Sequence, residues 1–181
     1  DPENELVIKR VIHTTADFDY ADNLTFSDHA VQKGIAALKS GCDIVTDTQM
    51  AKAGINKTIL ASLGGEVHCF MSDPDVAQEA RSRGVTRAFV SMEKAAALEK
   101  PCIFAIGNAP TALLSLEQLM EEGKAAPALI IGVPVGFVNV EISKERIIEK
   151  ARAPYIVARG RKGGSNVAAA ICNALLYQIR R

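Results

Sequence analysis

An arginine and a histidine three residues apart form the first pair of side chains in this sequence that suggests chemistry. Arg10 and His13 lie in the segment KRVIHTTADFDYADN, residues 9–23. Residues three apart share one face of a helix. Histidine changes its charge near neutral pH, so His13 can give or take a proton, whereas Arg10 can hold a carboxylate. A half-buried histidine without a function fits the local residues more often than a proton donor does, so both interpretations stay open at this point.

Polar and glycine-rich segments follow the predicted strands, where ligands commonly bind in open α/β sheets. Several of them lead into helices, whose N-termini present free N–H groups suited to anions. These segments are residues 46–48, 71–74, 107–111, 133–137 and 159–165. The last one, RGRKGGS, combines three glycines with Arg159, Arg161 and Lys162. Such residues are also ordinary turn formers, so an anion site and simple turns are both consistent with the pattern.

The spacing of these residues excludes several common motifs. The lysine of GRKGGS precedes the glycine pair, unlike the lysine of a P-loop, and the third glycine of a dinucleotide fingerprint is missing. The sequence contains no G-x-S-x-G elbow and no cluster with metal-ligand spacing. Asp17, Asp19 and Asp22 do not have EF-hand spacing and fit a solvated turn better. We therefore expect the protein to supply no metal site.

Short apolar stretches alternate with amphipathic segments along the chain. The expected strands are residues 42–47, 66–71, 101–108, 127–134 and 154–160. The expected helices are residues 5–15, 25–41, 48–55, 72–84, 86–99, 109–123, 143–151 and 164–180, with Ser27 as an N-cap and Pro110 in a first turn. This alternation predicts an α/β fold with a mostly parallel open sheet and helices on both faces, a Rossmann-like three-layer sandwich.

The balance of charges argues against nucleic acid or a membrane surface as a partner. The 181 residues include 21 Lys and Arg and 21 Asp and Glu, so the formal net charge is zero. No apolar run is long enough to span a membrane, and no signal peptide is recognised. The four cysteines are far apart and form no C-x-x-C pair. We expect them to be reduced, in a cytoplasmic protein.

Seven segments resemble, in their order, the precorrin-8X methylmutase family of cobalamin biosynthesis. They are RVIHTTADFDYADNLTFS, GCDIVTDTQMAKAGI, EVHCFMSDP, GVTRA, AIGNAPTALLSL, PALIIGVPVGFVNVEISKE and RGRKGGSNVAAAICNALL. Each motif is a modest signal, but their joint order and spacing make the resemblance specific. It implies one domain over residues 1–181. The family carries a further N-terminal helical segment with a substrate-contacting serine, which we expect this domain to lack.

The resemblance implies an isomerase that moves a methyl group from C11 to C12 of a corrin precursor by a 1,5-sigmatropic shift. The substrate would be precorrin-8X or cobalt-precorrin-8, the product hydrogenobyrinate or cobyrinate, and no cofactor would be consumed. The form of ADFDYADNLTFS is more similar to the anaerobic, cobalt-containing branch. The resemblance also implies a homodimer with its active site near the subunit interface.

Residue roles follow from the same resemblance. The family histidine falls on His13, as proton donor and acceptor for the macrocycle, and two substrate-contacting arginines fall on Arg10 and Arg87. A flat apolar ring with carboxylates at its rim needs an apolar floor, several anion clamps and one positioned acid. The further candidates for contacts with these carboxylates are Thr14, Thr15, Asn108, Thr111 and Ser165.

Two other functions remain open from the sequence. A corrinoid carrier on the same fold would bind the product without accelerating its formation. A Rossmann-like enzyme for nucleotides or phosphosugars would use GRKGGS, although the missing glycine and the missing P-loop lysine speak against it.

Overall fold

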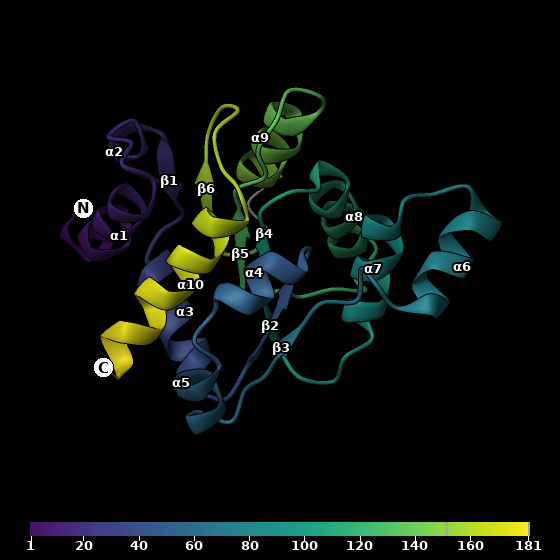
Figure 1. Cartoon of the computed structure of the whole chain (residues 1–181), viewed down its shortest axis with the longest axis horizontal. Coiled ribbons are helices and arrows are strands. Elements are labelled where there is room, and N and C mark those ends of the chain that lie inside the picture. Colours follow the sequence, from purple (N-terminus) through teal and green to yellow (C-terminus); the bar gives the residue numbers. More distant parts are fainter. Residues whose placement is uncertain (151, 181) are drawn as a thin grey trace.

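The computed structural model describes residues 1–150 and 152–180 and shows a six-stranded sheet between two layers of helices (Figure 1). The strands are β1 (Leu24–Phe26), β2 (Asp43–Thr46), β3 (Val67–His68), β4 (Cys102–Ile106), β5 (Leu129–Gly132) and β6 (Tyr155–Ala158). Their order in the sheet is β1-β6-β5-β4-β2-β3. Only β1 pairs antiparallel, with β6, and the other neighbours are parallel. The predicted α/β class and mostly parallel sheet are confirmed.

Ten α-helices and one short 3-10 helix connect the strands within the described residues. They are η1 (Pro2–Asn4), α1 (Glu5–Thr15), α2 (Tyr20–Asn23), α3 (Ala30–Lys39), α4 (Gln49–Gly54), α5 (Lys57–Ser62), α6 (Pro74–Arg83), α7 (Arg87–Ala96), α8 (Pro110–Glu121), α9 (Val140–Lys150) and α10 (Ser165–Ile179). None of these helices has both the length and the apolar character needed to cross a membrane. The helix predicted over 143–151 is α9, and residue 151 lies outside the described residues.

The helices cover both faces of the sheet because successive strand residues point to opposite sides. On β4, Ile103 and Ala105 join the apolar core that contains residues of α1, α3 and α10. Phe104 and Ile106 join the other core, under α7, α8 and α9. All five residues of β4 are buried, as expected for a parallel strand at the centre of a three-layer sandwich.

The segment before α3 differs from the prediction. Residues 24–26 form the edge strand β1, which the sequence analysis did not identify. Ser27 was expected to cap α3, but the residue at the N-cap is His29, whose backbone is left-handed with φ of 56°. The Ser27 hydroxyl instead accepts a hydrogen bond from the Tyr155 N–H at 2.8 Å. The pairing of β1 with β6 holds Ser27 against the sheet, and this contact cannot be read from local sequence.

Candidate active site

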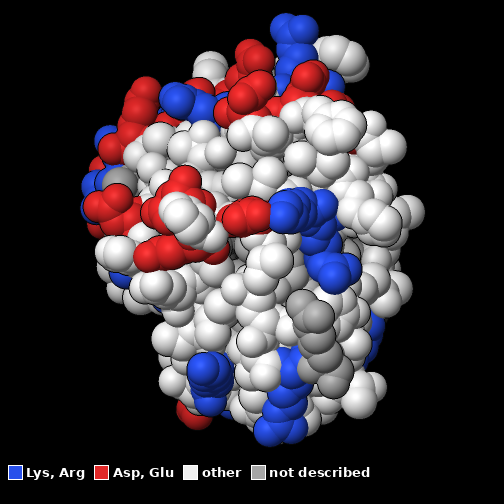
Figure 2. All heavy atoms as spheres, turned by 90° about the vertical axis from the view of Figure 1, so that its left-hand side faces the viewer, with Lys and Arg blue, Asp and Glu red and all other residues white. Residues whose placement is uncertain are grey.

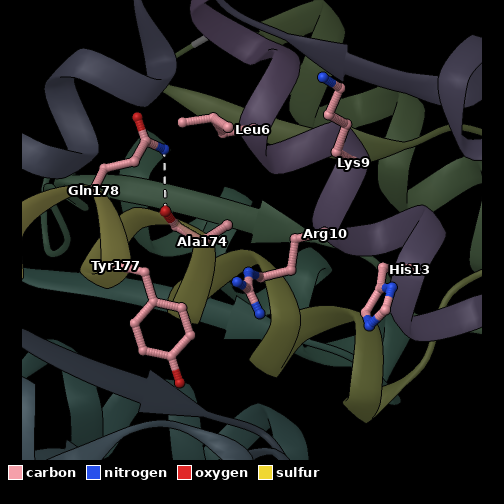
Figure 3. Close-up of a pocket in the computed structure, with 7 residues that line it drawn as sticks. All are labelled: Leu6, Lys9, Arg10, His13, Ala174, Tyr177 and Gln178. Atoms are coloured by element: carbon pink, nitrogen blue, oxygen red, sulfur yellow. Dashed lines mark hydrogen bonds between the residues drawn. The ribbon is translucent and has the colours of Figure 1, made fainter. Parts of the chain in front are cut away.

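Arg10 and His13 lie in one groove between α1 and α10, and their side chains point from α1 toward α10 (Figure 3). The groove has a volume of about 230 Å³. Its lining residues are Leu6, Lys9, Arg10 and His13 of α1 and Ala174, Tyr177 and Gln178 of α10. The predicted pair is therefore brought together in space as well as in sequence.

The amphipathic pattern of α1 explains how this pair is presented. Val7 and Val11 are fully buried in the core, so the helix is fixed along that face. The helix ends two residues after His13, where Ala16 adopts a left-handed conformation and donates its N–H to the Ile12 carbonyl at 2.7 Å. His13 thus occupies an exposed position in the last turn of α1.

Arg10 contacts Tyr177, and both residues line the groove. Its guanidinium carbon lies 4.7 Å from the centre of the Tyr177 ring, within the range of a cation–π interaction. No salt bridge to Arg10 is found among residues 1–150 and 152–180. A guanidinium that stacks on an aromatic ring keeps N–H donors in its own plane, so Arg10 can still bind a carboxylate.

The glycine-rich loop, residues 159–164, adjoins the His13 end of the groove. Lys162 Nζ lies 2.6 Å from Oδ2 of both Asp17 and Asp19, which follow His13 closely in the chain. Arg159 forms a two-bond salt bridge with Glu145. Two of the three cations that were considered for anion binding are therefore paired within the protein. The third cation, Arg161, lies over the exposed ring of Phe137, with its guanidinium carbon 5.5 Å from the centre of the ring.

Asp47 is a central residue of the site region that the sequence analysis missed. The side chain is buried and accepts hydrogen bonds from the N–H groups of Gly107 (2.9 Å), Asn108 (2.9 Å) and Ala109 (2.6 Å). Burial raises the pKa of Asp47, whereas the three N–H donors favour its charged form. These donors at the start of α8 were expected to serve a ligand, but Asp47 already occupies them.

The polar candidates divide into two groups. The hydroxyls of Thr15 and Ser165 have internal partners, because Thr15 donates to the Val11 carbonyl at 2.8 Å and Ser165 lies 2.8 Å from the Thr48 hydroxyl. The Thr111 hydroxyl accepts from Thr86 at 3.2 Å. Thr14 and Asn108 are exposed to solvent.

Arg87 lies far from the groove within one chain. It is the first residue of α7, which packs against α6 and α8. In Figure 1, α1 lies at one end of the longest axis, and α7 lies on the far side of the sheet, next to α6, which forms the other end. Arg87 is exposed and does not line the groove that holds Arg10 and His13.

On the face that bears α1, Figure 2 shows acidic and basic side chains next to one another in several places, with uncharged side chains between these groups.

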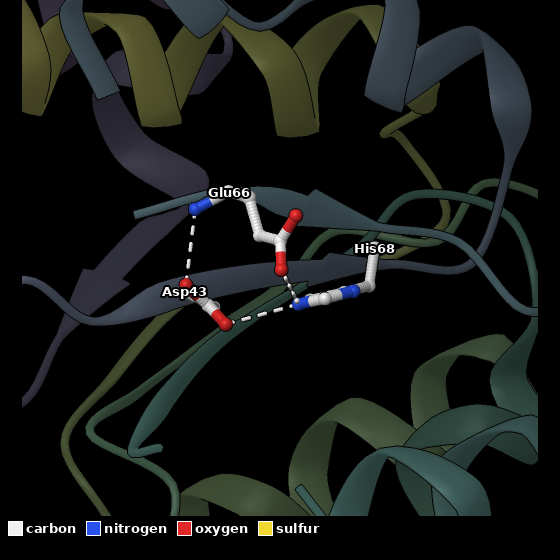
Figure 4. A group of neighbouring side chains, drawn as sticks. All are labelled: Asp43, Glu66 and His68. Carbon is white, nitrogen blue, oxygen red and sulfur yellow. Dashed lines mark hydrogen bonds and ion pairs between the residues drawn. The ribbon is translucent and has the colours of Figure 1, made fainter. Parts of the chain in front are cut away.

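A second cluster of titratable side chains lies at the opposite edge of the sheet, where β2 and β3 begin (Figure 4). His68 Nε2 is 3.0 Å from Asp43 Oδ2 and 3.6 Å from Glu66 Oε1. Asp43 Oδ1 accepts from the Glu66 N–H at 3.0 Å and from Lys100 at 3.2 Å. Because Lys100 already neutralises the buried Asp43 carboxylate, we interpret this cluster as a hydrogen-bonded brace between the strands.

This brace predicts a specific dependence of stability on pH. Burial alone would raise the pKa of Asp43, but the bonds from His68, Glu66 N–H and Lys100 together lower it. The stabilisation is therefore complete above the unfolded-state pKa of about 4 and is lost as pH falls through the lower folded-state pKa. Asp43→Asn should be less stable than the parent protein at pH 7, and the difference should shrink toward pH 2. Urea unfolding across this range measures it, and a constant difference would contradict the prediction.

The fold is an α/β sandwich, and its groove brings together a histidine, which can exchange a proton, and an arginine, which can bind a carboxylate. A model of the precorrin-8X methylmutase family matches residues 1–178. The chain belongs to this family, whose members are isomerases that transfer a methyl group within one molecule.

Individual relatives agree with the family model. The cobalt-precorrin-8 methylmutase of Salmonella typhimurium is 50% identical over 180 residues, which cover 99% of this chain and 83% of the relative. The precorrin-8X methylmutase of Pseudomonas aeruginosa is 40% identical over 172 residues, 94% of this chain and 82% of the relative. The solved structure of precorrin-8x methyl mutase from Thermus thermophilus superposes with a TM-score of 0.88 at 39% identity, over 98% of this chain and 86% of that chain.

Proposed function

We propose that this protein moves a methyl group from C11 to C12 of a corrin precursor in cobalamin biosynthesis. The observation that carries the proposal is the shared groove of Arg10 and His13, in a chain that belongs to the methylmutase family. Cobalt-precorrin-8 is the proposed substrate and cobyrinate the product, because the relatives from Salmonella typhimurium, Priestia megaterium and Leptospira interrogans are all named cobalt-precorrin-8 methylmutases. Residues 1–181 act as one domain around a single sheet.

His13 is the proposed acid. The reaction is an isomerisation in which the bond from the methyl group to C11 breaks and a bond to C12 forms, so no electrons or atoms are gained or lost. Protonation of the ring system draws electron density from the migrating centre, and the proton returns to His13 afterwards. This role needs a histidine that a ligand can reach, and the exposure of His13 at the end of the groove supports it.

Arg10 and Arg87 are the proposed clamps for substrate carboxylates. Arg10→Ala should weaken binding of the corrinoid product by about tenfold or more, because a charge-assisted hydrogen bond contributes about 1.5–3 kcal/mol. Arg10→Lys should recover only part of this affinity, since an ammonium cannot bind a carboxylate through two parallel bonds. Tyr177→Leu is the control, because it removes the stacking partner of Arg10 and leaves the charge. Titration of visible absorbance measures each affinity, and unchanged affinity in Arg10→Ala and Arg87→Ala would assign both arginines a structural role.

The remaining polar candidates have weaker support. Thr14 and Asn108 are proposed to contact substrate carboxylates. Both side chains are exposed, Thr14 in α1 beside His13 and Asn108 just before α8. Thr15, Thr111 and Ser165 are proposed to contribute only if the bound substrate competes for their hydroxyls, which have partners in the free protein.

A homodimer is the proposed assembly, with the active site near the interface between the copies. The groove of about 230 Å³ is smaller than a typical small-molecule site of roughly 300–1,000 Å³. A tetrapyrrole therefore needs contacts beyond those of the groove. Arg87 of the same chain does not line the groove and lies too far away to provide them. The segment 135–142 exposes Val135, Phe137, Val138 and Ile142, which would form an apolar patch suited to a second copy.

Charge introduced into this segment should break the dimer. The double variant Phe137→Asp and Val138→Asp places two carboxylates where the side chains are now 82% and 78% exposed in one chain. It should sediment as a monomer and lose most of its turnover. Met50→Asp is the matched control, because Met50 is also an exposed apolar residue but lies outside the segment. A double variant that still sediments as a dimer would contradict this interface.

The proposed location is the cytoplasm. The four cysteines are free and buried, and none forms a disulfide with another. Burial raises the pKa of the Cys42 thiol to about 12, which keeps it protonated and unreactive. Reduced structural cysteines support a reducing compartment.

The decisive experiment follows isomerisation in the absence of any co-reactant. The protein is incubated with cobalt-precorrin-8 in buffer that contains a chelator and no methyl donor, and the visible spectrum and mass of the corrinoid are recorded. A changed spectrum at unchanged mass supports the methylmutase, and precorrin-8X in a parallel sample tests the requirement for cobalt. Binding without conversion would support the carrier instead, and a requirement for a nucleotide or a methyl donor would refute the isomerase.

A further inference from the structure

Lys144 on α9 is a buried cation that the roles described above do not use. Its side chain has no exposed surface and is the largest of the fully buried side chains in the described residues. Transfer of a charge from water to the interior is costly unless hydrogen bonds compensate it. Lys144 Nζ donates to the carbonyls of Gly160 at 2.8 Å and Lys162 at 2.9 Å. Burial lowers the pKa of Lys144 to about 8, while Glu141 opposes the shift.

Both carbonyls belong to the loop 159–164, whose backbone is closely packed from the other side. Gly164 N–H donates to the Val133 carbonyl at 2.9 Å, and a Cβ at Gly163 would lie only 2.1 Å from the same oxygen. Gly160 has a φ of +90°, which favours glycine. The loop is thus fixed between the end of β5 and the ammonium of Lys144.

The loop 159–164 is connected to both helices that line the groove, α1 and α10. Lys162 binds Asp17 and Asp19 through its side chain, and these residues directly follow the end of α1 that bears His13. Gly164 is the N-cap of α10, which supplies the opposite wall. The Lys162 carbonyl accepts a hydrogen bond from Lys144, and the Lys162 side chain pairs with Asp17 and Asp19 just after α1. Lys162 therefore connects the buried cation to the site.

We propose that Lys144 is a positioning residue for the methylmutase site, which sets the loop 159–164 and through it the relative placement of His13 and α10. The proposal rests on the proposed function of His13. Lys144 is not among the residues that line the groove. An apolar side chain of similar volume could fill its site without the cost of burying a charge, so the structure uses the ammonium to orient two carbonyls. Removal of these bonds leaves the loop free to adopt other conformations.

The test compares two substitutions on the same helix. Lys144→Met keeps an unbranched side chain that lacks only the terminal ammonium, and so removes the donors, whereas Lys150→Met changes an exposed lysine of α9. Lys144→Met should lower kcat by about tenfold or more, with a smaller change in KM, and amide hydrogen exchange should rise in residues 159–164 and 14–19. Lys150→Met should match the parent protein in both measurements. Lys144→Arg, which keeps donors at this position, should recover part of kcat.

Two outcomes would overturn the proposal. One is a folded Lys144→Met with the parent's kcat per folded molecule and unchanged exchange in the loop, as a purely stabilising residue would give. If Lys144→Met does not fold, Lys162→Met interrupts the same connection at an exposed side chain, and unchanged kcat and exchange in residues 14–19 would also overturn it. Hydrogen exchange does not depend on turnover, so a parent protein that shows no isomerisation would count against the proposed function alone.

Discussion

Replacement of His13 by asparagine is expected to lower turnover by about 10²–10⁴-fold, the usual contribution of a positioned acid or base. Asparagine keeps much of the volume of histidine and can still form hydrogen bonds, but it cannot transfer a proton. Affinity for the corrinoid should change little, because most of it comes from ring contacts and carboxylate clamps.

The histidine at position 29 provides the control for this experiment. His29 is exposed and lies 3.2 Å from Glu3 Oε1, far along the chain from the groove residues. His29→Asn should therefore keep the turnover of the parent protein. Initial rates of the parent protein and both variants are measured at saturating substrate. A His13→Asn variant with near-parent turnover would remove His13 from the mechanism.

The sequence was sufficient to predict the elements with strong periodicity. The buried pair Val7 and Val11 sets the face of α1, so the shared face of Arg10 and His13 followed from spacing alone. The apolar runs of β4 and β5 likewise predicted strands. Weak or short elements were missed, because α2, β1 and α5 have six residues or fewer and little pattern of their own.

The polar interactions of the site region could not be predicted, because they join residues that are far apart in the sequence. Lys162 lies 145 residues from Asp17, and no local pattern indicates that they pair. The sequence left open whether the glycine-rich loop is an anion site or a simple turn. The structure shows that two of its cations, Lys162 and Arg159, pair with carboxylates of neighbouring elements. A cation in a loop can pair with a carboxylate of the protein or with a carboxylate of a ligand, and the local sequence does not distinguish these two cases.

Asp47 gives the second large expected effect, on stability and on the geometry of the site together. Asp47→Ala leaves three N–H groups at the start of α8 without their acceptor, of which that of Gly107 is buried. An unpaired buried donor costs about 1–3 kcal/mol, and the two part-buried donors add less, so the variant should lose about 2–5 kcal/mol in total. This is a large share of the roughly 5–15 kcal/mol that stabilises a typical domain. Urea unfolding measures the loss.

The effect of Asp47→Ala should reach α10, because the backbone at Gly107 packs directly against the start of that helix. A Cβ at Gly107 would lie 2.7 Å from the Gly164 carbonyl oxygen, so displacement of residues 107–109 must move the N-terminus of α10. Asp47→Asn retains one acceptor and should lose less stability than Asp47→Ala. Asp75→Ala is the control, since Asp75 is an exposed aspartate in the first turn of α6 whose side chain pairs with Lys94. Equal unfolding midpoints for Asp47→Ala and Asp75→Ala would show that the three N–H groups find other partners, and Asp47 would then not organise this edge of the sheet.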